Sequence, residues 1–396
     1  MTDVAARLAD LSDRGLRRRL RLVEGPQGPS VRLDDREVLL LCSNNYLGLA
    51  DDPRVREAAA RAALHWGAGA GASRLISGTM EPHRYLEVEL AEFEGFPEAL
   101  VVGAGYLANT GTIAALAEPG EVIFSDELNH ASIIDGCRLA RAETRVYRHR
   151  DLDHLAWSLE DAGGRAALIV TDGVFSMDGD LAPLRELYEL AQRHGARLLV
   201  DEAHATGAIG PGGRGTIREA GLAGEPGVVL VGTLGKALGA YGAYVCADHG
   251  TVDYLLNAAR PFVFSTAPPP AAVAAAAEAL TILREQPQRV EALRRNATVL
   301  REALAREGLT VPSETQILPI QVGEAEPTMR LCELLLERGV FAQGIRPPTV
   351  PKGTSRLRLA VMSTHAPEDL EAAARTIGKA ARELEVATGE RLAAAR

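Results

Sequence analysis

Short apolar runs alternate with helical periodicity between about residues 52 and 285, and this alternation constrains the fold more than any other feature. The runs are rich in β-branched residues and apolar nearly throughout: ALVVGAG, EVIFSDE, TRVYRH, AALIVTDGVF, ARLLVDEAH, VVLVGTLG, YGAYVCA and FVFSTA. Strands of this kind, separated by helices, are typical of a mostly parallel sheet with helices on both faces. The sequence therefore predicts an α/β fold.

Polar residues close several of the expected strands. Asp126, Asp172, Asp201 and Thr233 each stand at the end of an apolar run. Ligands of such sheets bind beyond the carboxyl ends of the strands. We therefore expect the functional site at this edge of the sheet.

The chain is expected to have three parts: an N-terminal arm over residues 1–45, a large α/β domain over 46–285 and a small α+β domain over 286–396. The arm reads as a helix with a short β segment that can pack against either domain. In the small domain the pattern predicts helices around 290–308 and 329–339, strands at 317–323 and 355–361, and a closing helix from about Pro367.

The net charge of −10 gives no general attraction to a phosphate backbone and argues against nucleic acid as the main partner. Residues 201–204 spell DEAH, the name of a helicase box. A helicase also needs a phosphate loop of the form G-x-x-x-x-G-K-[ST]. Lys236 is followed by Ala237 instead, and Leu230 stands at the earlier glycine position, so a nucleic-acid motor is disfavoured.

The four cysteines lie far apart without C-x-x-C spacing, which indicates neither a zinc site nor a disulfide framework. We expect buried, reduced thiols and no metal. The N-terminus lacks the apolar centre of a secretory signal. The longest apolar tract is interrupted by Glu278 and is too short to span a bilayer. A soluble, cytoplasmic protein is the expectation.

The turn GAGYLA, residues 103–108, follows an expected strand and opens an expected helix. It matches the relaxed dinucleotide fingerprint, and Asp126 follows about twenty residues on. Small residues at such a turn also suit any helix amino end that approaches an anion. The motif therefore predicts an anion site and leaves an NAD-dependent dehydrogenase as an alternative.

Lys236 lies just past an apolar run and is flanked by three glycines, at 232, 235 and 239. Backbone can approach a flat ligand closely there, and partial burial favours the neutral amine that forms imines. The alternative is an ordinary solvated lysine. The chain has only three lysines, and this one stands in its glycine-richest segment.

Asp201 and Lys236 stand at the ends of successive expected strands. A carboxylate can keep the ring nitrogen of pyridoxal phosphate protonated, while an amine from a neighbouring strand end tethers the cofactor. His204 could then reach the ring hydroxyl. His130, placed before an expected helix, could stack on the ring, although a capping role for its neighbours would leave it incidental. The pair of Asp201 and Lys236 predicts a pyridoxal phosphate enzyme.

Arginines near the C-terminus suggest a carboxylate-binding site. Arg346 and Arg358 bracket rigid prolines, and arginine can hold a carboxylate in a bidentate fork. The alternative is a pair of surface arginines on an edge strand. The basic run at residues 17–19 is more typical of a solvated helix face.

The ordered motifs resemble those of the α-oxoamine synthases, a branch of the fold-type-I pyridoxal phosphate enzymes. The resemblance covers about residues 16–385 and rests on SNNYLGLA, GAGASRLISG, HRYLEVELAEFEG, VTDGVFSMDGDLAPL, VDEAHATGAIG, GTLGKALG and IRPPTVPKGTSRLRL. It implies an aspartate aminotransferase-like fold and a homodimer with the active site at the subunit interface.

The resemblance also assigns roles at the cofactor. It implies that Lys236 forms the internal aldimine and that Asp201 pairs with the pyridine nitrogen. His204 would contact the ring oxygen and His130 would stack on the ring. The remaining cofactor residues would be Gly105, Tyr106, Ser176 and Thr233, with Thr266 reaching the phosphate from a partner subunit.

For the substrate, the resemblance implies that Asn44 and Arg358 hold an amino-acid carboxylate, and that Thr349 and Arg17, or Arg18 beside it, contact the acyl group. The segment around Arg346 is most like members that condense L-alanine with a pimeloyl thioester, carried on CoA or a carrier protein, in biotin synthesis. FSDELNHASIIDG is shared with members that resemble glycine C-acetyltransferase, some of which accept several acyl thioesters, so that activity remains an alternative.

Overall fold

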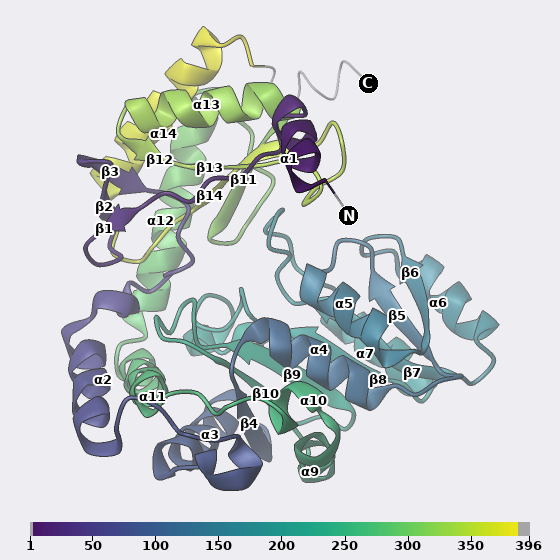
Figure 1. Cartoon of the computed structure of the whole chain (residues 1–396). Helices are drawn as coiled ribbons and strands as arrows, with labels where there is room; N and C mark the ends of the chain where they lie inside the picture. The colour runs from purple at the N-terminus through teal and green to yellow at the C-terminus, as the bar shows by residue number, and fades with distance from the viewer. Residues whose placement is uncertain (1–2, 387–396) are drawn as a thin grey trace. The chain divides into compact units, whose positions relative to one another are not determined.

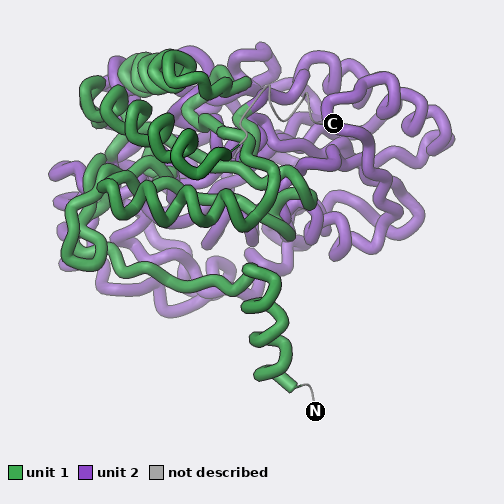
Figure 2. The backbone as a smooth tube through the Cα atoms, turned by 90° about the horizontal axis from the view of Figure 1, so that it is seen from above, with its two compact units in different colours: residues 1–48, 177–179, 291–396 green, residues 49–176, 180–290 purple. Residues whose placement is uncertain are grey.

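The computed structural model describes residues 3–386, so the outer ends of the expected arm and closing domain, residues 1–2 and 387–396, lie outside the described residues. Its contacts divide the chain into two compact units (Figure 2). Unit 1 comprises Met1–Gly48, Met177–Gly179 and Glu291–Arg396, and unit 2 comprises Leu49–Ser176 and Asp180–Val290.

Unit 2 is built on a seven-stranded sheet in the order β4-β10-β9-β8-β7-β5-β6 (Figure 1). Only β10 runs antiparallel to its neighbours. The strands are β4 (Glu98–Val102), β5 (Val122–Asp126), β6 (Glu143–Tyr147), β7 (Ala166–Asp172), β8 (Arg197–Asp201), β9 (Val228–Thr233) and β10 (Ala243–Ala247). The expected mostly parallel sheet is confirmed.

Helices cover both faces of this sheet because successive strand residues point to opposite sides. On β8, Leu199 belongs to a core cluster shared with α4, α5, α9 and α10, while α7 packs against β7 and β8. The helices of unit 2 are α2 (Pro53–Trp66), α3 (Glu81–Glu94), α4 (Gly105–Leu116), α5 (Ala131–Ala140), α6 (Leu152–Asp161), α7 (Leu184–Arg193), α8 (Gly215–Glu219), α9 (His249–Ala258), α10 (Arg260–Val263) and α11 (Pro270–Glu285).

The polar strand ends meet at one edge of the sheet. Strands β5, β7, β8 and β9 are parallel neighbours and end at Asp126, Asp172, Asp201 and Thr233. Asp172 is the direct register partner of Asp201. The sheet therefore gathers the predicted site residues at its carboxyl edge.

The expected strand FVFSTA is wrong. Residues 260–263 form the short helix α10, and Thr266 makes only an isolated bridge to Ser73. Pro261 at the first turn favours a helix start because its fixed φ suits that position. The buried ring of Phe262 then packs beneath α4 in place of a strand.

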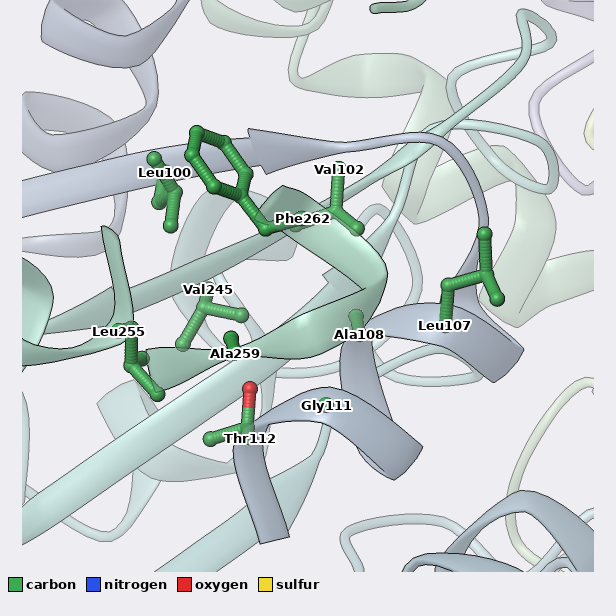
Figure 3. Close-up of a pocket in the computed structure, with 10 residues that line it drawn as sticks. All are labelled: Leu100, Val102, Leu107, Ala108, Gly111, Thr112, Val245, Leu255, Ala259 and Phe262. Carbon is green, nitrogen blue, oxygen red and sulfur yellow. The ribbon is translucent and has the colours of Figure 1, made fainter. Parts of the chain in front are cut away.

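An apolar pocket lies between α4, α9 and the sheet (Figure 3). Ten residues line it, and Thr112 is the only one with a polar side chain: Leu100, Val102, Leu107, Ala108, Gly111, Thr112, Val245, Leu255, Ala259 and Phe262. None of its lining residues carries a titratable group.

Unit 1 contains two smaller sheets, in the orders β1-β2-β3-β12 and β11-β14-β13. Strand β3 of the arm pairs in parallel with β12, so the arm joins this unit. The helices and strands expected after residue 287 are confirmed. The elements are α1 (Val4–Asp13), β1 (Val23–Glu24), β2 (Ser30–Leu33), β3 (Arg36–Leu40), α12 (Gln288–Arg306), β11 (Ile317–Gly323), α13 (Ala325–Glu337), β12 (Val340–Phe341), β13 (Gln343–Ile345), β14 (Ser355–Ala360) and α14 (Pro367–Glu383).

No helix within residues 3–386 is both long and apolar enough to cross a membrane. The four cysteines are free thiols, three of them buried and Cys42 partly exposed.

Candidate active site

Lys236 follows the carboxyl end of β9 and is half-buried. Its Nζ lies 2.7 Å from Nε2 of His204, which is buried in the turn after β8. A lysine amine held against an imidazole can pass a proton to it or receive one. The structure thus places two of the predicted site residues in direct contact.

Asp201 is the buried last residue of β8, 5% exposed. Its Oδ1 accepts the backbone N–H of Ala203 at 2.8 Å, and its Oδ2 accepts Nδ2 of Asn109, on α4, at 2.6 Å. These two hydrogen bonds hold the side chain in one orientation.

The amino end of α4 lies beside the end of β9. A Cβ built on Gly105 would stand 4.0 Å from Oγ1 of Thr233, and the helix has no side-chain cap on its first amides. Uncapped first-turn N–H groups and a nearby hydroxyl suit a phosphate. The first-turn amides of α4 and the hydroxyl of Thr233 form a cradle for a phosphate. This cradle, the buried Asp201 and the half-buried Lys236 together fit pyridoxal phosphate, which carries a phosphate, a ring nitrogen and an aldehyde.

His130 is positioned by the end of β7. Its backbone N–H donates to Oδ2 of Asp172 at 2.7 Å, and the side chain of Asn129 bonds the backbone of β7 through Val170 and Asp172. Burial beside Asp201 raises the pKa of Asp172 well above its usual value. Two acids, Asp172 and Asp201, therefore stand side by side at the ends of neighbouring strands.

His149 bridges two carboxylates close to this loop. Its Nδ1 lies 2.9 Å from Oδ1 of Asp126 and its Nε2 lies 2.7 Å from Oδ2 of Asp180. Burial favours the neutral ring, but the hydrogen bonds to the two carboxylates prevail and raise the pKa of His149 to about 9. Because Asp126 also accepts the N–H of Leu128 at 2.9 Å, the charged cluster anchors the segment that leads to His130.

This cluster predicts a pH-dependent stability. The folded pKa of about 9 exceeds the unfolded value near 6.5, so the stabilisation is complete below pH 6.5 and is lost as the pH rises through about 9. At its largest, the contribution of charged His149 to the free energy of unfolding is on the order of 3 kcal/mol. Urea unfolding of wild type and His149→Gln should differ by this amount near about pH 6 and converge near about pH 10.

The matched control is His249→Gln, because His249 also pairs with a carboxylate, that of Glu98, but is 76% exposed. An exposed pair contributes little, so this variant should unfold like wild type throughout the range. A gap between wild type and His149→Gln that stays constant with pH would contradict the role of the charge.

In unit 1, Arg358 of β14 is buried, 6% exposed. Its Nη2 donates to Oδ1 of Asn44 at 3.3 Å, and the hydroxyl of Tyr46 donates to the same oxygen at 3.1 Å. Burial raises the pKa of Tyr46 although the nearby guanidinium opposes it, so the phenol stays neutral. The structure brings Asn44 and Arg358 together, as expected for residues that hold one carboxylate.

The other expected substrate residues of unit 1 form a second group. Nη2 of Arg346 donates to the carbonyl of Arg17 at 3.2 Å, and Nη2 of Arg18 lies 3.5 Å from Oγ1 of the exposed Thr349. Two of the three arginines of the N-terminal run therefore lie at this loop, Arg17 through its backbone and Arg18 through its side chain.

Three expected cofactor residues make contacts of a different kind. Tyr106 is 46% exposed, and its hydroxyl donates to Asp135. Thr266 is exposed and forms a bridge with Ser73. Ser176 is half-buried and is the last residue of the first stretch of unit 2. The exposure of Thr266 is compatible with a role toward a second subunit.

Sequence reasoning missed two buried side chains at the site. Asn109 bonds both Asp201 and the hydroxyl of Ser132, which lies 2.8 Å from its Nδ2. Asn109 follows Gly105 by one helical turn, so its side chain lies on the face of α4 that carries the cradle. That spacing is the one signal that could have pointed to it.

Comparisons with known proteins identify the fold and the family of the chain. The family model for aminotransferase class I and II matches residues 36–377. A solved structure of serine palmitoyltransferase from S. paucimobilis, with a bound PLP–myriocin aldimine, has a TM-score of 0.91 at 32% identity and covers 96% of this chain and 97% of that one. The fold is thus the fold-type-I architecture of these aminotransferases.

The chain belongs to the α-oxoamine synthase family within the class I and II aminotransferases. An 8-amino-7-oxononanoate synthase of Citrifermentans bemidjiense is 51% identical over 391 residues, which cover 98% of this chain and 100% of the relative. The structure of an 8-amino-7-oxononanoate synthase from Francisella tularensis has a TM-score of 0.76 at 28% identity, covering 88% of this chain and 99% of that one.

Proposed function

We propose that this protein is a pyridoxal-phosphate-dependent acyltransferase that condenses L-alanine with a pimeloyl thioester. The products are 8-amino-7-oxononanoate, CO2 and the free thiol of CoA or of a carrier protein. The observation that carries the proposal is the contact of Lys236 with His204 at the sheet edge that also holds the buried Asp201. The full-length similarity to 8-amino-7-oxononanoate synthases supports the choice of substrates.

The residues of unit 2 would hold the cofactor. The amino end of α4 and Thr233 would bind its phosphate, Asp201 would pair with its ring nitrogen, and Lys236 would hold its aldehyde group. His204, beside that amine, would contact the ring oxygen. When bound, pyridoxal phosphate supplies an electron sink that stabilises negative charge at the Cα of the amino acid.

The chain's own groups then handle protons and charge. Nζ of Lys236 takes the proton from Cα of alanine and later returns one to the product, with His204 in reach to share it. Asp201, held by Asn109 and the backbone of Ala203, would pair with the ring nitrogen. His130 donates to the thioester carbonyl and stabilises the charge that develops there.

In unit 1, Asn44 and Arg358 bind the alanine carboxylate until it leaves as CO2. Arg346, Thr349 and Arg17 or Arg18 contact the pimeloyl group. We also propose a homodimer in which Thr266 reaches the partner's phosphate site, and a soluble protein of the cytoplasm. These assignments rest on the motif matches and on the buried pair of Asn44 and Arg358.

A substrate panel tests the proposal. The purified yellow protein is incubated with alanine, glycine or serine and with acetyl, pimeloyl or long-chain thioesters, and the products are identified by mass. We expect product from alanine and pimeloyl thioester far above every other pair. Preference for glycine with acetyl-CoA would identify a glycine C-acetyltransferase instead, and a colourless protein that responds to NAD would overturn the cofactor assignment.

A further inference from the structure

Four side chains of unit 2 form a continuous hydrogen-bonded path between Asp201 and His130. Nδ2 of Asn109 lies 2.6 Å from Oδ2 of Asp201 and 2.8 Å from Oγ of Ser132. Oγ of Ser132 lies 2.8 Å from Nδ1 of His130. Asn109 and Ser132 are each 1% exposed, so solvent does not compete for these bonds.

The direction of every bond in this path follows from the donors and acceptors. The Asn109 amide turns its nitrogen, with two N–H groups, toward Asp201 and Ser132, and an oxygen of each partner accepts one of these protons. The hydroxyl of Ser132 accepts one of these protons and is left to donate its own to His130. The backbone N–H of Ser132 points at the same Nδ1, at 3.3 Å, and an N–H can only donate.

We propose that Asn109 and Ser132 are positioning residues that hold His130 as the neutral imidazole protonated at Nε2. Two donors aim at Nδ1, which must therefore offer a lone pair, and the ring proton is left on Nε2. Among the described residues none hydrogen-bonds Nε2, so this N–H is available to a ligand. The proposal rests on the proposed function for its consequence, which is a fixed donor toward the thioester carbonyl.

The surroundings of His130 agree with a neutral ring. Desolvation by neighbouring groups lowers its pKa, the carboxylate of Asp201 opposes this, and the amine of Lys236 reinforces it. Asp172, the remaining acid at this edge, accepts the backbone N–H of His130 and has a raised pKa of its own. A neutral imidazole can donate from Nε2 without bringing a second charge to the site.

The tautomer can be measured directly. Full-length protein labelled with 15N-histidine is examined by NMR before and after addition of pyridoxal phosphate, and His130→Gln identifies the His130 signals among those of the nine histidines. Wild type should show the pattern of the Nε2–H tautomer. Asn109→Leu and Ser132→Ala should each give mixed tautomers and raise the pKa of His130 by about 0.5–1 unit.

Thr112→Val is the matched control, since Thr112 is buried on the same helix but lines the apolar pocket of Figure 3. It should leave the His130 signals unchanged. An Nδ1–H tautomer in wild type overturns the proposal. So does an unchanged tautomer in both Asn109→Leu and Ser132→Ala, or a change in Thr112→Val that equals theirs. The measurement needs no substrate, so a failed condensation assay counts against the proposed function alone.

Discussion

Replacing Lys236 with alanine is expected to remove the yellow colour of the purified protein and to leave no cofactor attached after borohydride reduction. Lys236 is the only lysine of unit 2, and its Nζ stands 2.7 Å from Nε2 of His204. Turnover should fall by about 10²–10⁴-fold or more, because the same amine moves the Cα proton. Absorption spectra and mass spectrometry of the reduced protein give both readouts.

The sequence provides a matched control for this prediction. The other two lysines, Lys352 and Lys379, are exposed, and their alanine variants should keep the colour and the borohydride-fixed mass. Peptide mapping of the reduced wild type should place the cofactor on the peptide that contains Lys236. An attachment to either of the other lysines, or a yellow Lys236→Ala protein with wild-type spectra, contradicts the assignment of the tether.

The strand ends could be predicted because burial on both faces makes each strand of a parallel sheet apolar and its polar terminus conspicuous. The pairing of Asp201 with Lys236 assumes that successive strands are neighbours. Strands β8 and β9 are indeed adjacent, and β7 lies on the other side of β8. The core of the candidate site was therefore accessible from local patterns.

Asn109 could not be predicted in the same way. It lies inside α4, a helix with almost no polar face, and its spacing of one turn from Gly105 does not by itself separate it from a structural asparagine. Its role appears only when α4 is packed over the end of β8, where the amide meets Asp201. Asn109 and Asp201 are 92 positions apart in the sequence, and sequence periodicity does not predict a tertiary contact over such a separation.

The course of the chain between the two units was equally hidden. Residues 177–179 return briefly to unit 1, where the carbonyl of Gly179 accepts the hydroxyls of Ser313 and Thr315. A Cβ at Gly179 would stand 2.5 Å from the carbonyl of Ile317, and its φ of +71° suits glycine. Residues 177–179 show no change in composition or periodicity that would mark them as part of unit 1. A division of the chain into three consecutive domains therefore does not describe this crossing.

The second large effect is expected for Asp201→Asn. Loss of the charge opposite the ring nitrogen should lower kcat by about 10²–10³-fold or more, because a neutral partner does not hold that nitrogen protonated. The fold should survive. The substituted amide keeps an oxygen for the N–H of Ala203, and the Asn109 amide can turn its Oδ1, which has no partner in the described residues, toward the new NH2 group. Cofactor binding, circular dichroism and kcat separate these effects.

The same turn of Asn109 gives the variant a second signature. With its oxygen facing Ser132 and the substituted side chain at position 201, the amide accepts the Ser132 proton that otherwise goes to His130. The Nε2–H tautomer of His130 then loses one of its two donors and keeps only the backbone N–H of Ser132. Asp172→Asn is the matched control, because Asp172 is the register partner of Asp201 on β7 and an asparagine oxygen there can still accept the backbone N–H of His130. It should cost far less activity and keep the His130 tautomer. Equal losses in the two variants would show that packing at this edge, and not the charge of Asp201, sets the rate.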